Sequence, residues 1–194
     1  MDKRKRLKRF NKTCRDIKSI KIQGARNIAR AALNAYSLLP TPKSRKILLS
    51  LRPTEPMLLN TLNNLETMSH NEILRHFNSA QDKINKNVLK LIKNNSVIFT
   101  HCHSSNVVLA LIYAKKHRKK FEVYNTETRP FFQGRKTARE LNKFGIKVTM
   151  FLDSEIDMAL EGQQGCKKVS LILLGADAIV KDGVINKIGS GMID

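Results

Sequence analysis

The first half of the chain has the apolar spacing of helices. One predicted helix ends at Pro40, because a proline interrupts helical hydrogen bonding and apolar residues recur every three to four positions before it. These residues are Ile28, Ala32, Tyr36 and Leu39.

A second helix start is marked by Ser69 and Glu72. They form the capping pattern S-x-x-E, in which each side chain satisfies a backbone N–H at the helix start. The helix that follows is predicted to carry one apolar face as far as Asn94–Asn95. That face consists of Ile73, Phe77, Ile84, Val88 and Leu91.

After Asn95 the pattern changes to short runs rich in β-branched and aromatic residues. Strands are predicted at 96–100, 121–125, 147–152 and 169–174, with helices at 105–117, 133–144 and 155–160. Alternating strands and helices imply parallel pairing through right-handed crossovers. Residues 179–185 form a hairpin signal, because Asp182-Gly183 suits a type I′ turn. The predicted fold is α/β, with a helical N-terminal domain (1–95) followed by a Rossmann-like, doubly wound parallel sheet (96–194).

Composition excludes several classes of protein. The 194 residues are 41% hydrophobic and 27% charged, so the chain is neither disordered nor fibrous. Its longest apolar run, Val107–Ala114, is too short to cross a membrane, and the basic N-terminus is not a secretory signal. Three scattered cysteines do not make a disulfide framework, which predicts a reducing, cytoplasmic location.

The formal net charge is +20, and much of it is concentrated at the start of the chain. The first 21 residues hold ten Lys or Arg and two acids. An arm that seeks RNA is one interpretation, since Lys and Arg neutralise phosphates. A solvated helix start is the other, and the sequence favours it because no aromatic residue other than Phe10 is interleaved and no RNA-binding motif is present.

Polar and reactive residues follow the predicted strands. In open parallel sheets, ligands bind outside the carboxyl ends of the strands. Cys102 follows the first strand and Asp177 the fourth, so a thiol and a carboxylate are expected at one edge. Such a pair can shuttle protons, the thiol as base and the carboxyl as acid. Taken singly, Cys102 is better explained as a small buried side chain and Asp177 as a cap; only as a pair at one edge do they favour function equally.

No metal site is predicted near His101, Cys102 and His103. Consecutive residues after a strand point to opposite sides, and no fourth ligand has the usual spacing. Neither GxxxxGK nor GxGxxG occurs, so an anion would be held by a helix N-terminus such as the one after Ser104.

Five ordered segments carry a resemblance to a known superfamily. They are THCHSS (100–105), TETRP (126–130), QGR (133–135), GADAI (175–179) and VINKIG (184–189). The chain closely resembles the superfamily of ribose-1,5-bisphosphate isomerases, methylthioribose-1-phosphate isomerases and the α, β and δ regulatory subunits of translation initiation factor 2B. Segments 20–31 and 51–54 also match, so the resemblance covers nearly the whole chain.

The THCHSS form is similar to the archaeal ribose-1,5-bisphosphate isomerases, which act in AMP breakdown. This resemblance implies conversion of ribose 1,5-bisphosphate to ribulose 1,5-bisphosphate without a cofactor or metal. It implies that Cys102 is the proton-abstracting base and that Asp177 is the acid assisting ring opening. The implied substrate contacts are Gln23, Gly24, Ala25, Arg26, Arg52, Ser104, Ser105, Asn186 and Lys187.

Two departures from the superfamily are visible. Gln23-Gly24-Ala25-Arg26 stands where the bisphosphate isomerases have Arg-Gly-Ala-Gly, so an arginine is displaced and a glycine is lost. Superfamily members also continue beyond the VINKIG segment with further strands, whereas this sequence stops at Asp194. We therefore expect a domain truncated at its C-terminus, with an exposed sheet edge.

The resemblance leaves two further functions open. One is a non-catalytic subunit like those of initiation factor 2B, with initiation factor 2 or RNA as partner. The other is methylthioribose-1-phosphate isomerase, which uses the same Cys–Asp pair on a monophosphate. Superfamily members assemble into dimers or larger rings, so the resemblance also implies a homo-oligomer.

Overall fold

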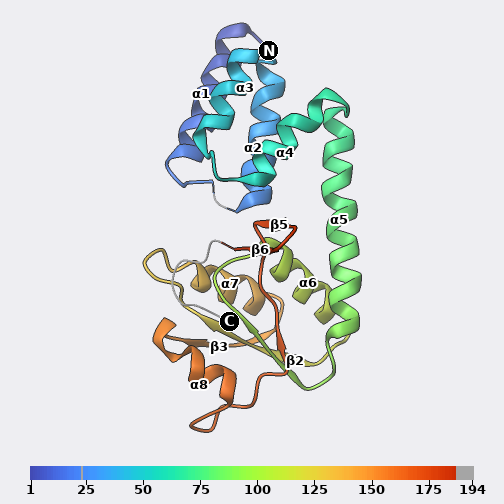
Figure 1. Cartoon of the computed structure of the whole chain (residues 1–194), viewed down its shortest axis with the longest axis vertical. Coiled ribbons are helices and arrows are strands. Elements are labelled where there is room, and N and C mark those ends of the chain that lie inside the picture. The colour runs from blue at the N-terminus through green and yellow to red at the C-terminus, as the bar shows by residue number, and fades with distance from the viewer. Residues whose placement is uncertain (23, 187–194) are drawn as a thin grey trace. The chain divides into compact units, whose positions relative to one another are not determined.

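The computed structural model describes residues 1–22 and 24–186 (Figure 1). They form two compact units. Of the described residues, the first unit contains those of Met1–Ser79 and Asp177–Val184, and the second contains Ala80–Ala176 with Ile185 and Asn186. The units therefore divide within a helix, whereas the sequence pattern suggested a domain boundary at Asn95. The predicted fold class is confirmed: helices come first in the chain and an α/β sheet follows.

The first unit is built mainly of helices. They are α1 (Lys3–Lys18), α2 (Ala25–Leu38), α3 (Pro42–Leu51), α4 (Pro56–Asn63), the 3-10 turn η1 (Asn64–Glu66) and the start of α5 (His70–Leu91). Thr41 caps α3 by accepting the Ser44 N–H at 3.1 Å, and Pro42 occupies its first turn. Apolar side chains from α1 to α4 pack into one core that includes Phe10, Ile28 and Leu48.

The capping pattern at the start of α5 is confirmed. The Ser69 N–H donates to Glu72 Oε2 at 2.7 Å, and the Glu72 N–H donates to Ser69 Oγ at 3.3 Å. Hydrogen bonding from the Ser69 side chain, and then from the Ser69 N–H, lowers the pKa of the Glu72 carboxyl.

The predicted apolar face of α5 is right at its start and wrong at its end. Ile73 and Phe77 are buried, but Leu91 is 58% exposed and Ile92 packs into the core instead. Gln81 and Asn85 are buried midway along the same stripe, where Gln81 Nε2 donates to Asn85 Oδ1 at 2.7 Å. The spacing of apolar residues alone does not detect two polar side chains that are buried on the same helix face because they hydrogen-bond to each other.

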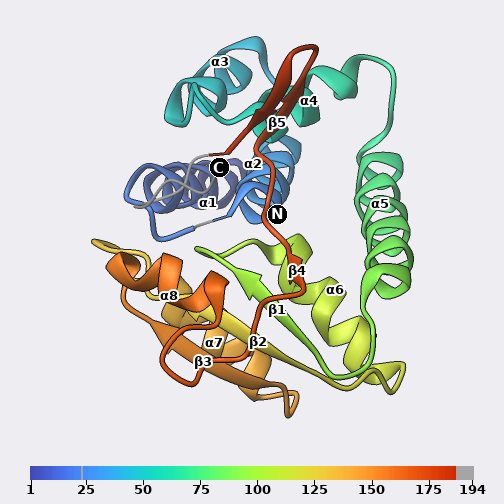
Figure 2. The same ribbon diagram turned by 60° about the horizontal axis from the view of Figure 1, so that its bottom comes forward.

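The second unit contains a parallel sheet in the order β3-β2-β1-β4, which Figure 2 shows from its lower side. Its strands are β1 (Ser96–Thr100), β2 (Phe121–Thr126), β3 (Lys147–Phe151) and β4 (Leu171–Ile172). The three pairs of neighbouring strands in this sheet are all parallel. β4 is shorter than predicted, yet the N–H groups of Ser170 and Leu173 still donate to carbonyls of β1. Within the described residues, β3 and β4 are the sheet edges.

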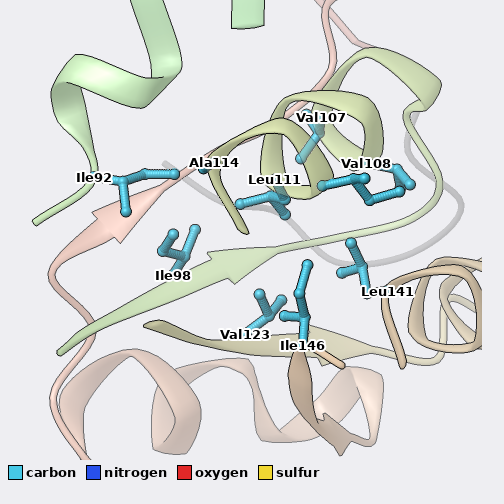
Figure 3. Close-up of a cluster of buried hydrophobic side chains, with 10 residues drawn as sticks. Ile92, Ile98, Val107, Val108, Leu111, Ala114, Val123, Leu141 and Ile146 are labelled. Carbon is cyan, nitrogen blue, oxygen red and sulfur yellow. The ribbon is translucent and has the colours of Figure 1, made fainter. Parts of the chain in front are cut away.

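Helices cover both faces of this sheet. They are α6 (Ser105–Lys116), α7 (Gln133–Asn142) and α8 (Ile156–Glu161), the last preceded by the 3-10 turn η2 (Asp153–Glu155). Ile98 and Val123 face α6 and Leu141 of α7 (Figure 3). The neighbouring β1 residues Val97 and Phe99 point to the other face, where they pack with Ile156 of α8. The predicted doubly wound sheet is therefore confirmed.

The predicted hairpin is present as β5 (Ala178–Val180) and β6 (Gly183–Ile185), which pair with each other. No helix in the described part of the chain is long and apolar enough to cross a membrane.

A glycine fixes the approach of α7 to the sheet. A Cβ on Gly134 would lie 1.7 Å from the Thr126 carbonyl oxygen, which is far inside van der Waals contact. Gly134 also donates its N–H to the Glu127 carbonyl and accepts from Asn125 Nδ2 at 2.8 Å. The start of α7 is thus held directly against the end of β2.

We predict that Gly134→Ala lowers the free energy of unfolding by about 3 kcal/mol, because α7 must move away from Thr126. Gly145→Ala is the matched control: it has φ of +68° and no neighbouring atom within 4 Å of the added carbon. The control carries only backbone strain, about 1 kcal/mol. Urea unfolding of both variants measures the difference, and equal losses would contradict the close approach.

Candidate functional site

The strand order reverses between β1 and β4. β2 and β3 follow β1 on one side, and the chain then crosses to place β4 on the other side. Ligands in such sheets bind outside the carboxyl ends of the two strands where the order reverses. Here those ends lead into Cys102–Ser105 and into Gly175–Asp177. A Cβ on Gly175 would lie 2.7 Å from Ser104 Oγ, so the two chain segments touch.

Cys102 is held in a conformation that few non-glycine residues adopt. Its φ is 65°, in the left-handed region. Its N–H donates to Thr128 Oγ1 at 3.0 Å, and its carbonyl accepts from Thr137 Oγ1 at 2.9 Å. Its thiol donates to Gln133 Oε1 at 2.9 Å. Backbone and side chain are therefore fixed by three residues that come from the β2–α7 region.

Asp153 in turn holds the loop that contacts Cys102. Its two carboxylate oxygens accept the N–H groups of Thr128 and Arg129, each at 2.7 Å. Bonds from backbone amides to a carboxylate are charge-assisted and stronger than neutral ones. The ends of β3, β2 and β1 are consequently linked in series, from Asp153 through Thr128 to Cys102.

The hydroxyl of Thr137 fixes the tautomer of His103. Thr137 has one hydroxyl proton, and the Cys102 carbonyl, which only accepts, takes it. His103 Nδ1, 2.9 Å from the same hydroxyl, must therefore donate to it. Neutral His103 then carries its proton on Nδ1 and a lone pair on Nε2. Burial, with a smaller contribution from the Lys136 charge, lowers the pKa of His103 to about 4.

A buried carboxylate organises the end of β2. Glu127 accepts from Arg129 Nε and from Arg135 Nη2, each at 2.8 Å. Both guanidinium groups also lie over the ring of Phe132. Arg135 first, and then Arg129, lowers the pKa of the Glu127 carboxyl by hydrogen bonding to it. These arginines are structural partners of Glu127 as well as positive charges at the same sheet edge.

Ser104 has a clear local role. It caps α6, and its Oγ accepts the Val107 N–H at 3.4 Å. Ser105 is the first residue of that helix. Both serines thus lie at a helix N-terminus, as the sequence predicted.

The predicted site residues fall in both units. Gly24, Ala25, Arg26, Arg52 and Asp177 belong to the first unit, and Cys102, Ser104, Ser105 and Asn186 to the second. Gln23 and Lys187 lie outside the described residues.

Local surroundings are defined for several of the residues in the first unit. Gly24 caps α2 with φ of +84°, a conformation that favours glycine. Arg26 Nη2 donates to Asn78 Oδ1 at 2.9 Å. Arg52 is the C-cap residue of α3.

Sequence reasoning missed the residues that hold Cys102. Thr128 and Gln133 lie in the TETRP and QGR segments, and Thr137 lies one helical turn after Gln133. That spacing was the available signal. Among the described residues, no three His, Cys, Asp or Glu side chains are placed to hold a metal ion, and the three cysteines form no disulfide.

Comparison with known proteins places the chain in a family. Residues 43–193 match the Initiation factor 2 subunit family, IF-2B. The ribose 1,5-bisphosphate isomerase of Thermococcus kodakarensis is 33% identical over 91% of this chain, and that of Archaeoglobus fulgidus is 30% identical over 91%. The chain belongs to the IF-2B family. It spans 64% and 63% of the lengths of these two relatives.

Solved structures show the same fold. The translation initiation factor eIF-2B of Pyrococcus horikoshii OT3 superposes with a TM-score of 0.75 at 28% identity, covering 93% of this chain and 71% of that one. The eIF2B-β2δ2 complex of Chaetomium thermophilum gives 0.69 at 17% identity, covering 90% and 66%.

We predict that the neutrality of His103 makes the protein less stable in acid. Unfolded histidine binds a proton below its ordinary pKa of 6.5, whereas folded His103 resists protonation until about 4. The unfolded state therefore binds more protons in this window, and stability falls as pH falls, by up to about 3 kcal/mol. His103→Asn, which keeps an N–H donor, should lose less stability between pH 7 and pH 4.5.

Urea unfolding at the two pH values makes the measurement. His76→Asn, at an exposed position on α5, is the matched control and should behave as the parent protein. An H103N variant with the parent's full acid sensitivity would contradict the assignment of His103 as a buried neutral group.

Proposed function

We propose that the protein is an aldose–ketose isomerase that converts ribose 1,5-bisphosphate to ribulose 1,5-bisphosphate. The observation that carries this proposal is the fixed position of the Cys102 thiol. It lies just after the carboxyl end of β1, at the edge of the sheet where the strand order reverses. The names of the relatives in Thermococcus and Archaeoglobus supply the substrate.

The reaction moves a proton between adjacent carbons, so it needs an acid–base pair rather than a cofactor. In the proposed mechanism Asp177 protonates the ring oxygen as the bond from that oxygen to C1 breaks. Cys102, as thiolate, takes the proton from C2, which leaves a C1–C2 enol with its phosphate still on C1. The Asp177 carboxylate then takes the C2 hydroxyl proton and the Cys102 thiol returns its proton to C1, which completes the ketose and restores both groups.

Gln133 suits a thiol that changes its protonation state. In the structure its Oε1 accepts from the thiol. Rotation of the amide by half a turn presents its N–H₂ group instead, which can donate to a thiolate. The same side chain can therefore hold Cys102 before and after proton transfer.

The substrate carries two phosphates, and the proposed contacts have the matching charge. Arg52, a guanidinium suited to bidentate phosphate binding, is assigned to one end and Lys187 to the other. Arg26 is proposed to replace the displaced arginine of the Gln23-Gly24-Ala25-Arg26 segment. The remaining contacts would come from Ser104, Ser105 and Asn186. A homo-oligomer, a role in AMP breakdown and a cytoplasmic location are predictions from the same resemblance.

We predict that the protein forms ribulose 1,5-bisphosphate from ribose 1,5-bisphosphate, as followed by ¹H and ³¹P NMR. Cys102→Ser should lower kcat/KM by about 100-fold or more, because a serine hydroxyl is a far weaker base than a thiolate. Its melting temperature should change little. Cys14→Ser and Cys166→Ser are matched controls and should keep the parent's turnover.

Two outcomes would contradict the proposal. One is a folded protein that forms no product, and the other is a Cys102→Ser variant as active as its parent. Turnover of methylthioribose 1-phosphate in the same assay, without turnover of ribose 1,5-bisphosphate, would identify a monophosphate isomerase instead.

A second candidate function has its own support. The similarity to the P. horikoshii structure named translation initiation factor eIF-2B favours a non-catalytic regulatory subunit. Immobilised protein would then retain purified initiation factor 2 from a relative such as Pyrococcus, with no turnover of sugar phosphates. Turnover without retention of the factor would exclude this alternative.

A further inference from the structure

The positive charge of the protein is concentrated in its first three helices. Residues 1–54 contain sixteen Lys or Arg and two acids, a net charge of +14. The other 140 residues carry the remaining +6. The stretch 1–54 is therefore far more basic than the rest of the chain and needs an explanation of its own.

Helix α1 presents its charge on one side. It holds nine Lys or Arg and one acid. Phe10 and Ile17 are buried and Cys14 is half-buried, so these three mark the side that packs into the helical core. At 100° per residue, six of the basic residues fall on the opposite half of the helix. They are Arg4, Lys5, Lys8, Arg9, Lys12 and Arg15.

Nothing nearby neutralises this half of α1, which we call the basic face. Within the described residues, Lys12 is the only member with an acidic partner, Asp16, at 3.8 Å. The helices that α1 contacts, α2 and α3, add Arg30, Lys43 and Lys46 at exposed positions and contain no acid. All six residues of the basic face are exposed.

We propose that the basic face of α1 binds the phosphate backbone of nucleic acids without sequence preference. Lys and Arg that neutralise phosphates release condensed counterions, which drives such binding. Arg adds bidentate contacts to phosphate oxygens. Phe10, the one aromatic residue of α1, is buried, so no ring is available to stack on bases.

The burial of the apolar side of α1 argues against a membrane. A helix that lies in a bilayer interface inserts its apolar face among the lipids. In α1 the apolar side chains Phe10, Cys14 and Ile17 are already packed in the helical core, and the exposed Leu7 lies outside the basic face, so that face has no apolar side chain to insert. A rigid convex helix also has no concave pocket for a small anion, whereas a polymer of phosphates can contact several side chains together.

The experiment measures fluorescence anisotropy with labelled RNA and DNA duplexes of equal length. Binding should weaken steeply with salt, and the two duplexes should bind with similar affinity because both present phosphates. Lys5, Lys8 and Lys12 changed together to Gln should weaken binding at least tenfold and reduce the slope of log Kd against log salt by about 3, roughly 0.9 per lost contact.

Lys83, Lys86 and Lys90 of α5 changed together to Gln form the matched control. These positions are exposed and the change removes the same charge. The control should keep the parent's affinity, and circular dichroism should show both triple variants folded. Equal losses in the two variants would overturn the proposal, since net charge alone would then explain binding.

Three other results would also overturn it. They are no binding of either duplex at low salt, a strong preference for one sugar type, and α1-dependent binding to phosphatidylserine vesicles in place of nucleic acid. None of these readouts depends on isomerase activity, so this proposal and the proposed function fail separately.

Discussion

The hydrogen bond from the Cys102 N–H to the Thr128 hydroxyl joins the two parts of the sheet edge on which the candidate chemistry depends. This bond ties the left-handed backbone at Cys102 to the loop that follows β2. Thr128 is itself held by Asp153, so the position of the thiol depends on the ends of three strands. Backbone strain of this kind persists only where its surroundings over-determine it, and such strain gathers at functional sites.

The close packing behind this edge has the same effect. Gly134 lets α7 start against the Thr126 carbonyl, which brings Gln133 and Thr137 to the thiol and the carbonyl of Cys102. The Thr137 hydroxyl oxygen in turn accepts a hydrogen bond from His103 Nδ1. One glycine and two hydroxyl groups thus fix the orientation of Cys102 and His103 after β1, which is the preorganisation that acid–base chemistry requires.

Strand positions were predictable because each strand is a short run of mainly apolar and β-branched residues between polar turns; β1 and β2 are buried along almost their whole length, whereas β3 and β4 are only partly buried. The cap at Ser69 and the existence of the hairpin were predictable from capping and turn signals, but the predicted type I′ turn at Asp182-Gly183 was wrong: the chain turns at Lys181-Asp182, neither with positive φ, and Gly183 begins β6. The left-handed Cys102 was not, because nothing in its neighbours' side chains demands that conformation; it results from bonds to residues 26 and 35 positions away. The prediction that Leu91 ends the buried face of α5 was wrong for a related reason. Packing against the sheet, not helical spacing, decides that Ile92 is buried there and Leu91 is exposed.

The proposed isomerase reaction requires ribose 1,5-bisphosphate to bind beside Cys102. Alkylation by iodoacetamide, followed cysteine by cysteine by mass spectrometry, tests it directly. We expect the bisphosphate to slow alkylation of Cys102 while Cys14 and Cys166 react at unchanged rates. If saturating bisphosphate leaves the alkylation of Cys102 unchanged, the substrate does not bind at this thiol and the account is wrong.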